Sequence, residues 1–227
     1  MKVEKQLIYI LNEQLMRKVI ITILFYQIAH TMQAQTKITS PVGEYYLRGV
    51  METAAGFKLN EDSTFQFFFS YGALDRQGRG KWKMEGNNII FDGSPKSLRD
   101  FKLTSSKKDE KEGITIIFTG GNAAINKYLH AIVRTGSKEE HTAAGNDGVA
   151  MLPAMKADTI ILFFEWCAEK KSVFTPDRTS DNHYTFELQP TIFDVVFDNF
   201  TMSVQSDKIT GTLPFSGDMV CNFVKEK

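Results

Sequence analysis

The sequence predicts an all-β fold, in which an antiparallel, barrel-like meander is combined with a β-sandwich-like module. The first observation is that hydrophobic residues alternate with polar ones along much of the chain, which is typical of half-buried strands. The second is that clusters of Gly, Asn and Asp separate these segments and favour turns. The third is that no long helical pattern follows the amino-terminal region; short helical turns are expected only at 95–99 and 123–128.

The composition is that of an ordinary globular protein. Of 227 residues, 42% are hydrophobic and 24% are charged, and 27 basic residues balance 27 acidic ones. A neutral chain without a long basic run lacks the cluster of positive charge that binds nucleic acid, so no nucleic-acid partner is predicted. The length suits one large domain or two small ones.

Residues 1–34 are predicted to be a signal peptide. Met16, Arg17 and Lys18 form a short basic start, and 19–29 is an apolar stretch of the length expected for the core of such a peptide. The charged residues before Met16 predict that this methionine is the true start. We therefore expect an exported protein, periplasmic or extracellular, with no stable transmembrane span after cleavage. The alternative is an uncleaved amino-terminal anchor.

Residues 35–99 are predicted to form the barrel-like meander. Hydrophobic positions alternate in 57–59 and 64–71, and the turn formers between them predict a hairpin. A loop is expected at 72–78, and two further short strands follow it. The meander therefore has about four or five strands.

Residues 100–178 are predicted to form the sandwich-like module. Apolar, β-branched segments predict strands at 114–118, 129–133 and 159–166. The polar stretches 94–111 and 134–146 are predicted to be loops between strands.

The carboxy-terminal part, 179–227, is predicted to add strands that pack with the preceding regions. Aromatic and aliphatic residues again alternate, first at Tyr184, Phe186 and Leu188, and then at Phe193, Val195 and Phe197. The last strands are expected at 209–213 and 219–224.

Two partial resemblances follow from this order of residues. The first is carried by Gly43, Tyr45, Leu47, Phe57, Leu59, Asp62, Phe65, Phe67, Gly80 and Trp82, and it resembles the opening meander of lipocalin-like (calycin) barrels. The second lies in 114–164, where strands separated by a Gly-Gly turn and an Asp-Gly turn resemble transthyretin-like or carboxypeptidase-regulatory-like modules. Together they resemble exported β proteins of Gram-negative bacteria.

The sequence contains no complete motif for covalent chemistry; Ser105 and Lys108 have the bare S-x-x-K spacing but lack its companion motifs. Metalloprotease, nucleophile-elbow, P-loop and dinucleotide-binding patterns are all absent. His130, His141 and His183 remain for acid–base or metal roles, but no two of them have the sequence spacing of metal ligands. No catalytic residue, metal or cofactor is therefore predicted.

Aromatic residues make up 12% of the chain and are its main compositional excess. Their simplest role is to fill a core, because aromatics favour strands and bury large areas. The functional alternative is an apolar ligand pocket lined by Tyr45, Phe65, Phe67, Phe69, Tyr71 and Trp82. Phe68 breaks the alternation, so either both faces of its strand are covered or one face bears a binding patch.

Two cysteines, Cys167 and Cys221, lie in apolar, strand-like segments. An oxidising compartment would allow them to form a disulfide, and the alternative is two buried thiols.

These observations predict an exported binding protein of unknown specificity, with an apolar small molecule as the ligand class. One alternative is a structural, adhesion or protein-interaction component of the bacterial envelope. Another is an exported hydrolase, which would need an acid–base cluster that the sequence does not display.

Overall fold

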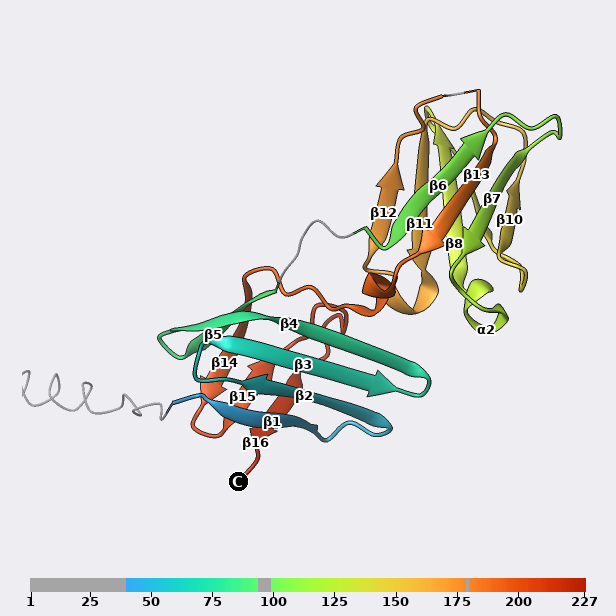
Figure 1. Cartoon of the computed structure of the whole chain (residues 1–227). Helices are drawn as coiled ribbons and strands as arrows, with labels where there is room; N and C mark the ends of the chain where they lie inside the picture. The colour runs from blue at the N-terminus through green and yellow to red at the C-terminus, as the bar shows by residue number, and fades with distance from the viewer. Residues whose placement is uncertain (1–39, 94–98, 179) are drawn as a thin grey trace, which may run out of the picture. The chain divides into compact units, whose positions relative to one another are not determined.

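The computed structural model describes residues 40–93, 99–178 and 180–227, and its fold is all-β (Figure 1). The predicted fold class is confirmed. The predicted signal peptide and nearly all of the expected turn at 95–99 lie outside the described residues. In the part of the chain that the structure describes, no helix is long and apolar enough to cross a membrane.

Eight of the described strands close an antiparallel barrel, in the order β1-β16-β15-β14-β5-β4-β3-β2. Their bounds are β1 (Gly43–Arg48), β2 (Thr53–Leu59), β3 (Thr64–Tyr71), β4 (Leu74–Glu85), β5 (Asn88–Gly93), β14 (Phe200–Gln205), β15 (Lys208–Gly211) and β16 (Cys221–Lys225). The first five form the predicted meander, including the β2–β3 hairpin. The barrel closes where β1 pairs with β16, with Tyr45 opposite Lys225.

The chain leaves the barrel after β5 and returns to it at β14. Between them the described strands form two four-stranded sheets, β10-β7-β13-β6 and β12-β11-β8-β9. Their bounds are β6 (Phe101–Lys107), β7 (Ile114–Thr119), β8 (Leu129–Thr135), β9 (Lys138–Ala143), β10 (Val149–Leu152), β11 (Thr159–Phe164), β12 (Lys171–Phe174) and β13 (His183–Leu188). The sandwich is therefore an insertion between two adjacent strands of the barrel, since β5 pairs with β14.

The barrel interior is filled by aromatic rings. Phe57 stacks on Phe91 with ring centroids 4.7 Å apart and meets Phe223 edge-on at 4.9 Å. These three side chains are almost completely buried. Burying one such side chain contributes about 1.5–3 kcal/mol, so the alternating phenylalanines account for much of the stability of the barrel.

The sandwich has its own core, made by the inward faces of its two sheets. Ile116, Phe186, Leu129 and Leu162 are among its fully buried members. Leu74, at the start of β4 in the barrel, packs against this same core. A side chain of the barrel therefore contacts the sandwich core.

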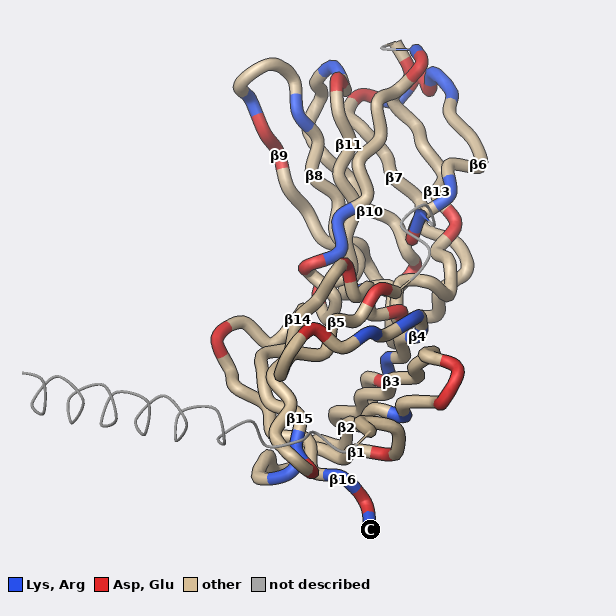
Figure 2. The backbone as a smooth tube through the Cα atoms, turned by 90° about the vertical axis from the view of Figure 1, so that its left-hand side faces the viewer, with Lys and Arg blue, Asp and Glu red and all other residues tan. Residues whose placement is uncertain are grey.

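Three segments that the sequence predicted to be loops contain strands. β4 begins inside the expected loop at 72–78, β6 occupies part of 94–111, and β9 occupies part of 134–146. β6 and β9 are edge strands, so their side chains are mostly exposed and polar, as the charged residues of β9 show (Figure 2). Period-two hydrophobicity fails to detect such strands because hydrogen bonds to one neighbour, rather than burial, hold them in place.

One expected strand is two residues shorter than predicted, and a second alternating segment does not form a regular strand. The 159–166 segment ends as β11 at Phe164, and a 3-10 turn, η2 (Glu165–Cys167), follows. The alternation at 193–197 falls partly in a second 3-10 turn, η3 (Pro190–Phe193), because Pro190 fixes its own backbone in a helical range and cannot donate a ladder hydrogen bond. The short helix expected at 123–128 is confirmed as α2 (Ala123–Asn126), capped by Asn122.

Candidate functional site

The six aromatic residues predicted to line a pocket lie in three different environments. Tyr45, Phe65 and Phe67 are buried inside the barrel. Phe69 and Trp82 are half-buried, and Tyr71 is 54% exposed near the end of β3. The structure therefore gathers only part of this set around one interior.

The outer face of the barrel carries a second aromatic group. Tyr46, Gly56, Phe68 and Gln77 are aligned across β1, β2, β3 and β4 by the strand register. The rings of Tyr46 and Phe68 have centroids 6.3 Å apart, on either side of Gly56. A Cβ at Gly56 would lie 2.7 Å from the ring of Phe68, so the absence of a side chain there lets the two rings approach each other.

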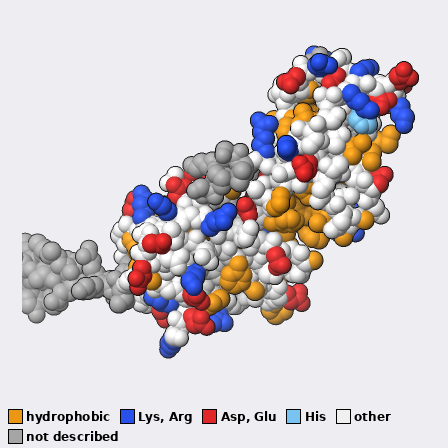
Figure 3. Space-filling model, in the orientation of Figure 1, with side chains coloured by type: hydrophobic (Ala, Val, Ile, Leu, Met, Phe, Trp, Pro, Cys, Tyr) orange, Lys and Arg blue, Asp and Glu red, His pale blue; other side chains and the backbone are white. Residues whose placement is uncertain are grey.

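Phe68 lies on the opposite face from the inward-facing aromatics of β3 and is 43% exposed. Figure 3 shows a small group of hydrophobic side chains over β2 and β3 on this side, bordered by basic and acidic ones. The break in alternation at Phe68 thus corresponds to an aromatic side chain that faces away from the core.

Tyr46, Phe68 and Gln77 line a cleft of about 750 Å³. Most of its lining comes from β1 to β4, including Tyr46, Gln66, Phe68 and Arg79. The remainder comes from segments outside the barrel strands, namely Asp100, Lys170, Thr191 and the connector 194–198, without Phe197. Volumes of this size are typical of small-molecule sites.

The connector is held against β4 by hydrogen bonds. The Val195 amide donates to the Gln77 carbonyl at 2.6 Å, and the Gln77 side-chain amide donates to Asp194 Oδ1 at 3.2 Å. Val195 is buried by this arrangement, whereas Val196 is 41% exposed. Val196 therefore adds apolar surface to the cleft.

One side of the cleft contains a short polar chain. The Tyr46 hydroxyl donates to Glu44 Oε2 at 2.8 Å, and Lys58 Nζ lies 3.0 Å from Glu44 Oε1. The hydrogen bonds from Tyr46 and Lys58 hold the pKa of Glu44 below its usual value, and the bond to Glu44 raises the pKa of Tyr46. Tyr46 is thereby fixed in orientation beside Phe68.

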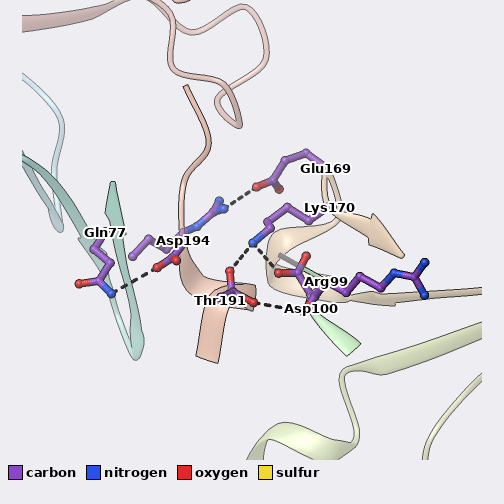
Figure 4. A network of polar contacts seen from close by, with 8 residues as sticks. Gln77, Arg99, Asp100, Glu169, Lys170, Thr191 and Asp194 are labelled. Atoms are coloured by element: carbon purple, nitrogen blue, oxygen red, sulfur yellow. Dashed lines mark hydrogen bonds and ion pairs between the residues drawn. The ribbon is translucent and has the colours of Figure 1, made fainter. Parts of the chain in front are cut away.

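The other side of the cleft is braced by ion pairs and hydrogen bonds from several elements (Figure 4). Lys170 Nζ lies 2.8 Å from Asp100 Oδ1 and also donates to the Thr191 carbonyl. Nearby, Arg76 Nη2 on β4 is 2.5 Å from Glu169 Oε1. Among the described residues no acidic partner is found for Arg79, which makes it the cation of the cleft that is free to meet a ligand.

Both cysteines are free thiols in the structure. Cys167 ends η2 and belongs to the sandwich core, whereas Cys221 begins β16 of the barrel. Burial raises the pKa of each thiol. A protonated, buried thiol is a poor nucleophile, so neither residue is a candidate catalytic cysteine.

Of the three histidines beyond residue 34, the fold brings two together, which their spacing in the sequence did not indicate. His130 on β8 and His141 on β9 lie together on the outer face of one sheet, with Nδ1 of the first 3.0 Å from Nε2 of the second. His183 lies on β13, 3.6 Å from Asp109. Across the described ranges, no group of three or more His, Cys, Asp or Glu residues is arranged to hold a metal ion.

Sequence reasoning missed most of the cleft. Gln66, Gln77 and Arg79 are ordinary polar positions of strands, and nothing in their spacing marks them as a group. Two signals were available: Phe67, which was predicted to line a pocket and does line the cleft, and Phe68, an aromatic residue where the alternation required a polar one.

No known family model matches this chain, and a search of curated proteins finds none with significant similarity.

Proposed function

We propose that this protein binds a small molecule with an apolar part in the cleft on the outer face of β1 to β4. The observation that carries the proposal is the pair of half-buried Tyr46 and exposed Phe68 at the cleft, with ring centroids 6.3 Å apart. Exposed aromatic surface in a concave site favours a ligand, because covering it removes apolar area from water.

The polar groups around these rings are suited to orient such a ligand. Gln66, Gln77 and Arg79 line the same cleft. Amide and guanidinium groups donate hydrogen bonds to hydroxyl, carbonyl or acidic groups of a bound molecule. The proposed ligand therefore combines an apolar surface with at least one acceptor group.

The site lies outside the barrel because aromatic rings occupy the interior. Phe57 alone has five ring neighbours with centroids between 4.7 and 6.4 Å. The closed barrel of eight strands supports the resemblance to lipocalin-like proteins at the level of architecture. Here the ligand is proposed to bind on the outer face, in the periplasm or outside the cell.

The edge strands of the sandwich support a second candidate function, as a protein-interaction component of the bacterial envelope. Among the described strands, β6 and β9 each pair with a single neighbour, and most of their residues are exposed. An exposed edge can accept a strand from a partner chain. The charged residues of β9 oppose this use at that edge, so β6 is the better candidate.

The test is titration of the full chain with the fluorescent probe anilinonaphthalenesulfonate, which has an aromatic body and an acidic group. We expect saturable binding at one site, and we expect Phe68→Ala to weaken it about tenfold, which corresponds to the loss of one aromatic contact. Native mass spectrometry of the protein purified from its own source then identifies the bound small molecule.

The matched control is Val173→Ala, which removes an exposed apolar side chain on β12 that does not line the cleft (Val173 is 58% exposed). This variant should bind the probe like the wild type. If Phe68→Ala and Val173→Ala bind equally well, the cleft is not the site and the envelope-partner function becomes the better explanation.

A further inference from the structure

Two histidines on the outer face of the sandwich lie with their ring nitrogens in close contact. His130 and His141 are eleven residues apart, but the β8–β9 hairpin pairs Ile132 with His141 and His130 with Ala143. The two histidines are therefore diagonal neighbours on one face of the sheet. His130 Nδ1 lies 3.0 Å from His141 Nε2.

The carboxylate of Glu165 fixes the tautomer of His130. Glu165, at the start of η2, has its Oε2 atom 3.1 Å from His130 Nε2. An ionised carboxylate only accepts hydrogen bonds, so Nε2 carries the proton and the lone pair is on Nδ1. That lone pair is on the nitrogen that faces His141.

The ring of His130 is also held in place by packing. Phe163 on β11 stacks on it with centroids 4.8 Å apart and planes 5° apart. The side chain of His130 is only 14% exposed, whereas His141 on the edge strand is exposed. The ring of His130 is therefore held in one orientation. His141 is open to solvent, so an ion can reach both nitrogens from outside.

We propose that His130 and His141 bind a divalent transition-metal ion of the Zn²⁺ or Cu²⁺ class, with water completing its coordination. Metal–imidazole bonds are about 2.0–2.1 Å long. Two nitrogens bound to one ion at such distances are separated by roughly 3.0 Å when the angle at the ion is near 90°. The observed separation therefore allows both nitrogens to bind one ion after small rotations of the rings.

The class of ion follows from the ligand atoms. Imidazole nitrogen suits zinc, copper and nickel, whereas magnesium and calcium prefer oxygen ligands. A carboxylate that accepts the other N–H of a metal-bound histidine raises the basicity of that ligand and orients it. Glu165 occupies this position relative to His130.

The experiment is isothermal titration of the full chain with Zn²⁺ and, separately, with Cu²⁺, each checked by metal analysis after dialysis. We expect one equivalent to bind, with Cu²⁺ tighter than Zn²⁺. His141→Ala should abolish that equivalent, and because this side chain is exposed on an edge strand the variant keeps its fold. Circular dichroism verifies the fold of each variant.

Two further variants distinguish metal binding at His130 and His141 from metal binding at other histidines. His183→Ala is the matched control, since His183 lies on the other sheet beside Asp109, and it should retain the full equivalent. Glu165→Gln should bind at the same stoichiometry with an affinity lower by about tenfold or more, as expected for loss of an outer-sphere carboxylate. Absence of a bound equivalent in the wild type, or its persistence in His141→Ala, would overturn the proposal.

Discussion

The ring of Phe197 meets the ring of Phe57 edge-on inside the barrel, with centroids 5.7 Å apart. Phe57 belongs to β2, whereas Phe197 belongs to the connector through which the chain returns from the sandwich. The Phe197 carbonyl also accepts a 2.6 Å hydrogen bond from the Gly93 amide, at the point where the chain leaves the barrel. The returning connector therefore supplies a core side chain to the barrel, which couples the insertion to the packing of the barrel.

This coupling predicts that Phe197→Ala destabilises the whole barrel. Phe197 is completely buried and contacts five other phenylalanine rings. Replacing such a side chain by alanine leaves a cavity and costs about 3–5 kcal/mol. The free energy of unfolding in urea, followed by tryptophan fluorescence and circular dichroism, measures the loss.

The neighbouring residue provides the control. Val196 is 41% exposed, so Val196→Ala should change the free energy of unfolding by no more than about 0.5 kcal/mol. Equal effects of the two substitutions would mean that the connector does not contribute to the barrel core.

A second prediction concerns the ion pair between Arg76 and Glu169. The Arg76 side chain is 1% exposed, its Cζ lies 4.5 Å from the centroid of the Phe215 ring, and its Nε has no hydrogen-bond partner in the described residues. Removing the carboxylate leaves a buried, uncompensated cation. We therefore expect Glu169→Ala to cost about 3–5 kcal/mol.

The double variant Arg76→Met with Glu169→Ala should recover most of that loss, because it removes the buried charge along with its partner. An exposed pair is the control: Lys83 and Glu85 have side chains 62% and 58% exposed, and Lys83→Ala should cost less than about 1 kcal/mol. If Glu169→Ala costs no more than Lys83→Ala, the pair between β4 and Glu169 is not formed in solution.

The strands that the sequence predicted best are those with one buried face. Phe65 and Phe67 alternate with outward residues, and the period-two pattern follows directly from the pleat of the strand. The polar edge strands β6 and β9 were missed because little of their stability comes from burial.

Barrel closure and the cleft could not be predicted for a different reason. The pairing of Tyr45 with Lys225 joins opposite ends of the described chain, and no local pattern specifies it. The cleft likewise combines Arg79 with Lys170, which are separated in the sequence by most of the strands of the sandwich. The histidine pair was not predicted either, because His141 lies in β9, inside a segment expected to be a loop, and only the register of the β8–β9 hairpin makes His130 and His141 neighbours.

The cysteines give a third prediction. With Cys167 and Cys221 both buried and free, a thiol reagent should modify neither in the native protein and both after unfolding in denaturant without reductant. Burial raises the pKa of both thiols, which further lowers their reactivity. Detection of no thiol in the unfolded protein would instead demonstrate the disulfide that an oxidising compartment allows.

The last prediction is a loss of stability at alkaline pH caused by two buried tyrosines. The hydroxyl of Tyr45 donates to the Pro41 carbonyl at 2.8 Å, and that of Tyr184 donates to the Asp181 carbonyl at 2.7 Å. Burial is the main cause that raises the pKa of both phenols to about 12, from an ordinary value of 10.0. The native state therefore keeps two protons that the unfolded state releases.

The stabilising effect of these raised pKa values is fully present below pH 10 and declines as the pH rises toward 12, because the unfolded state then binds fewer protons than the native state. Urea unfolding at neutral pH and at about pH 11 measures this decline. Tyr45→Phe cannot ionise, so it should lose less stability between the two pH values, although its lost hydrogen bond costs about 1 kcal/mol at neutral pH. An identical alkaline decline in the wild type and in the variant would show that the ionisation of Tyr45 does not contribute to it.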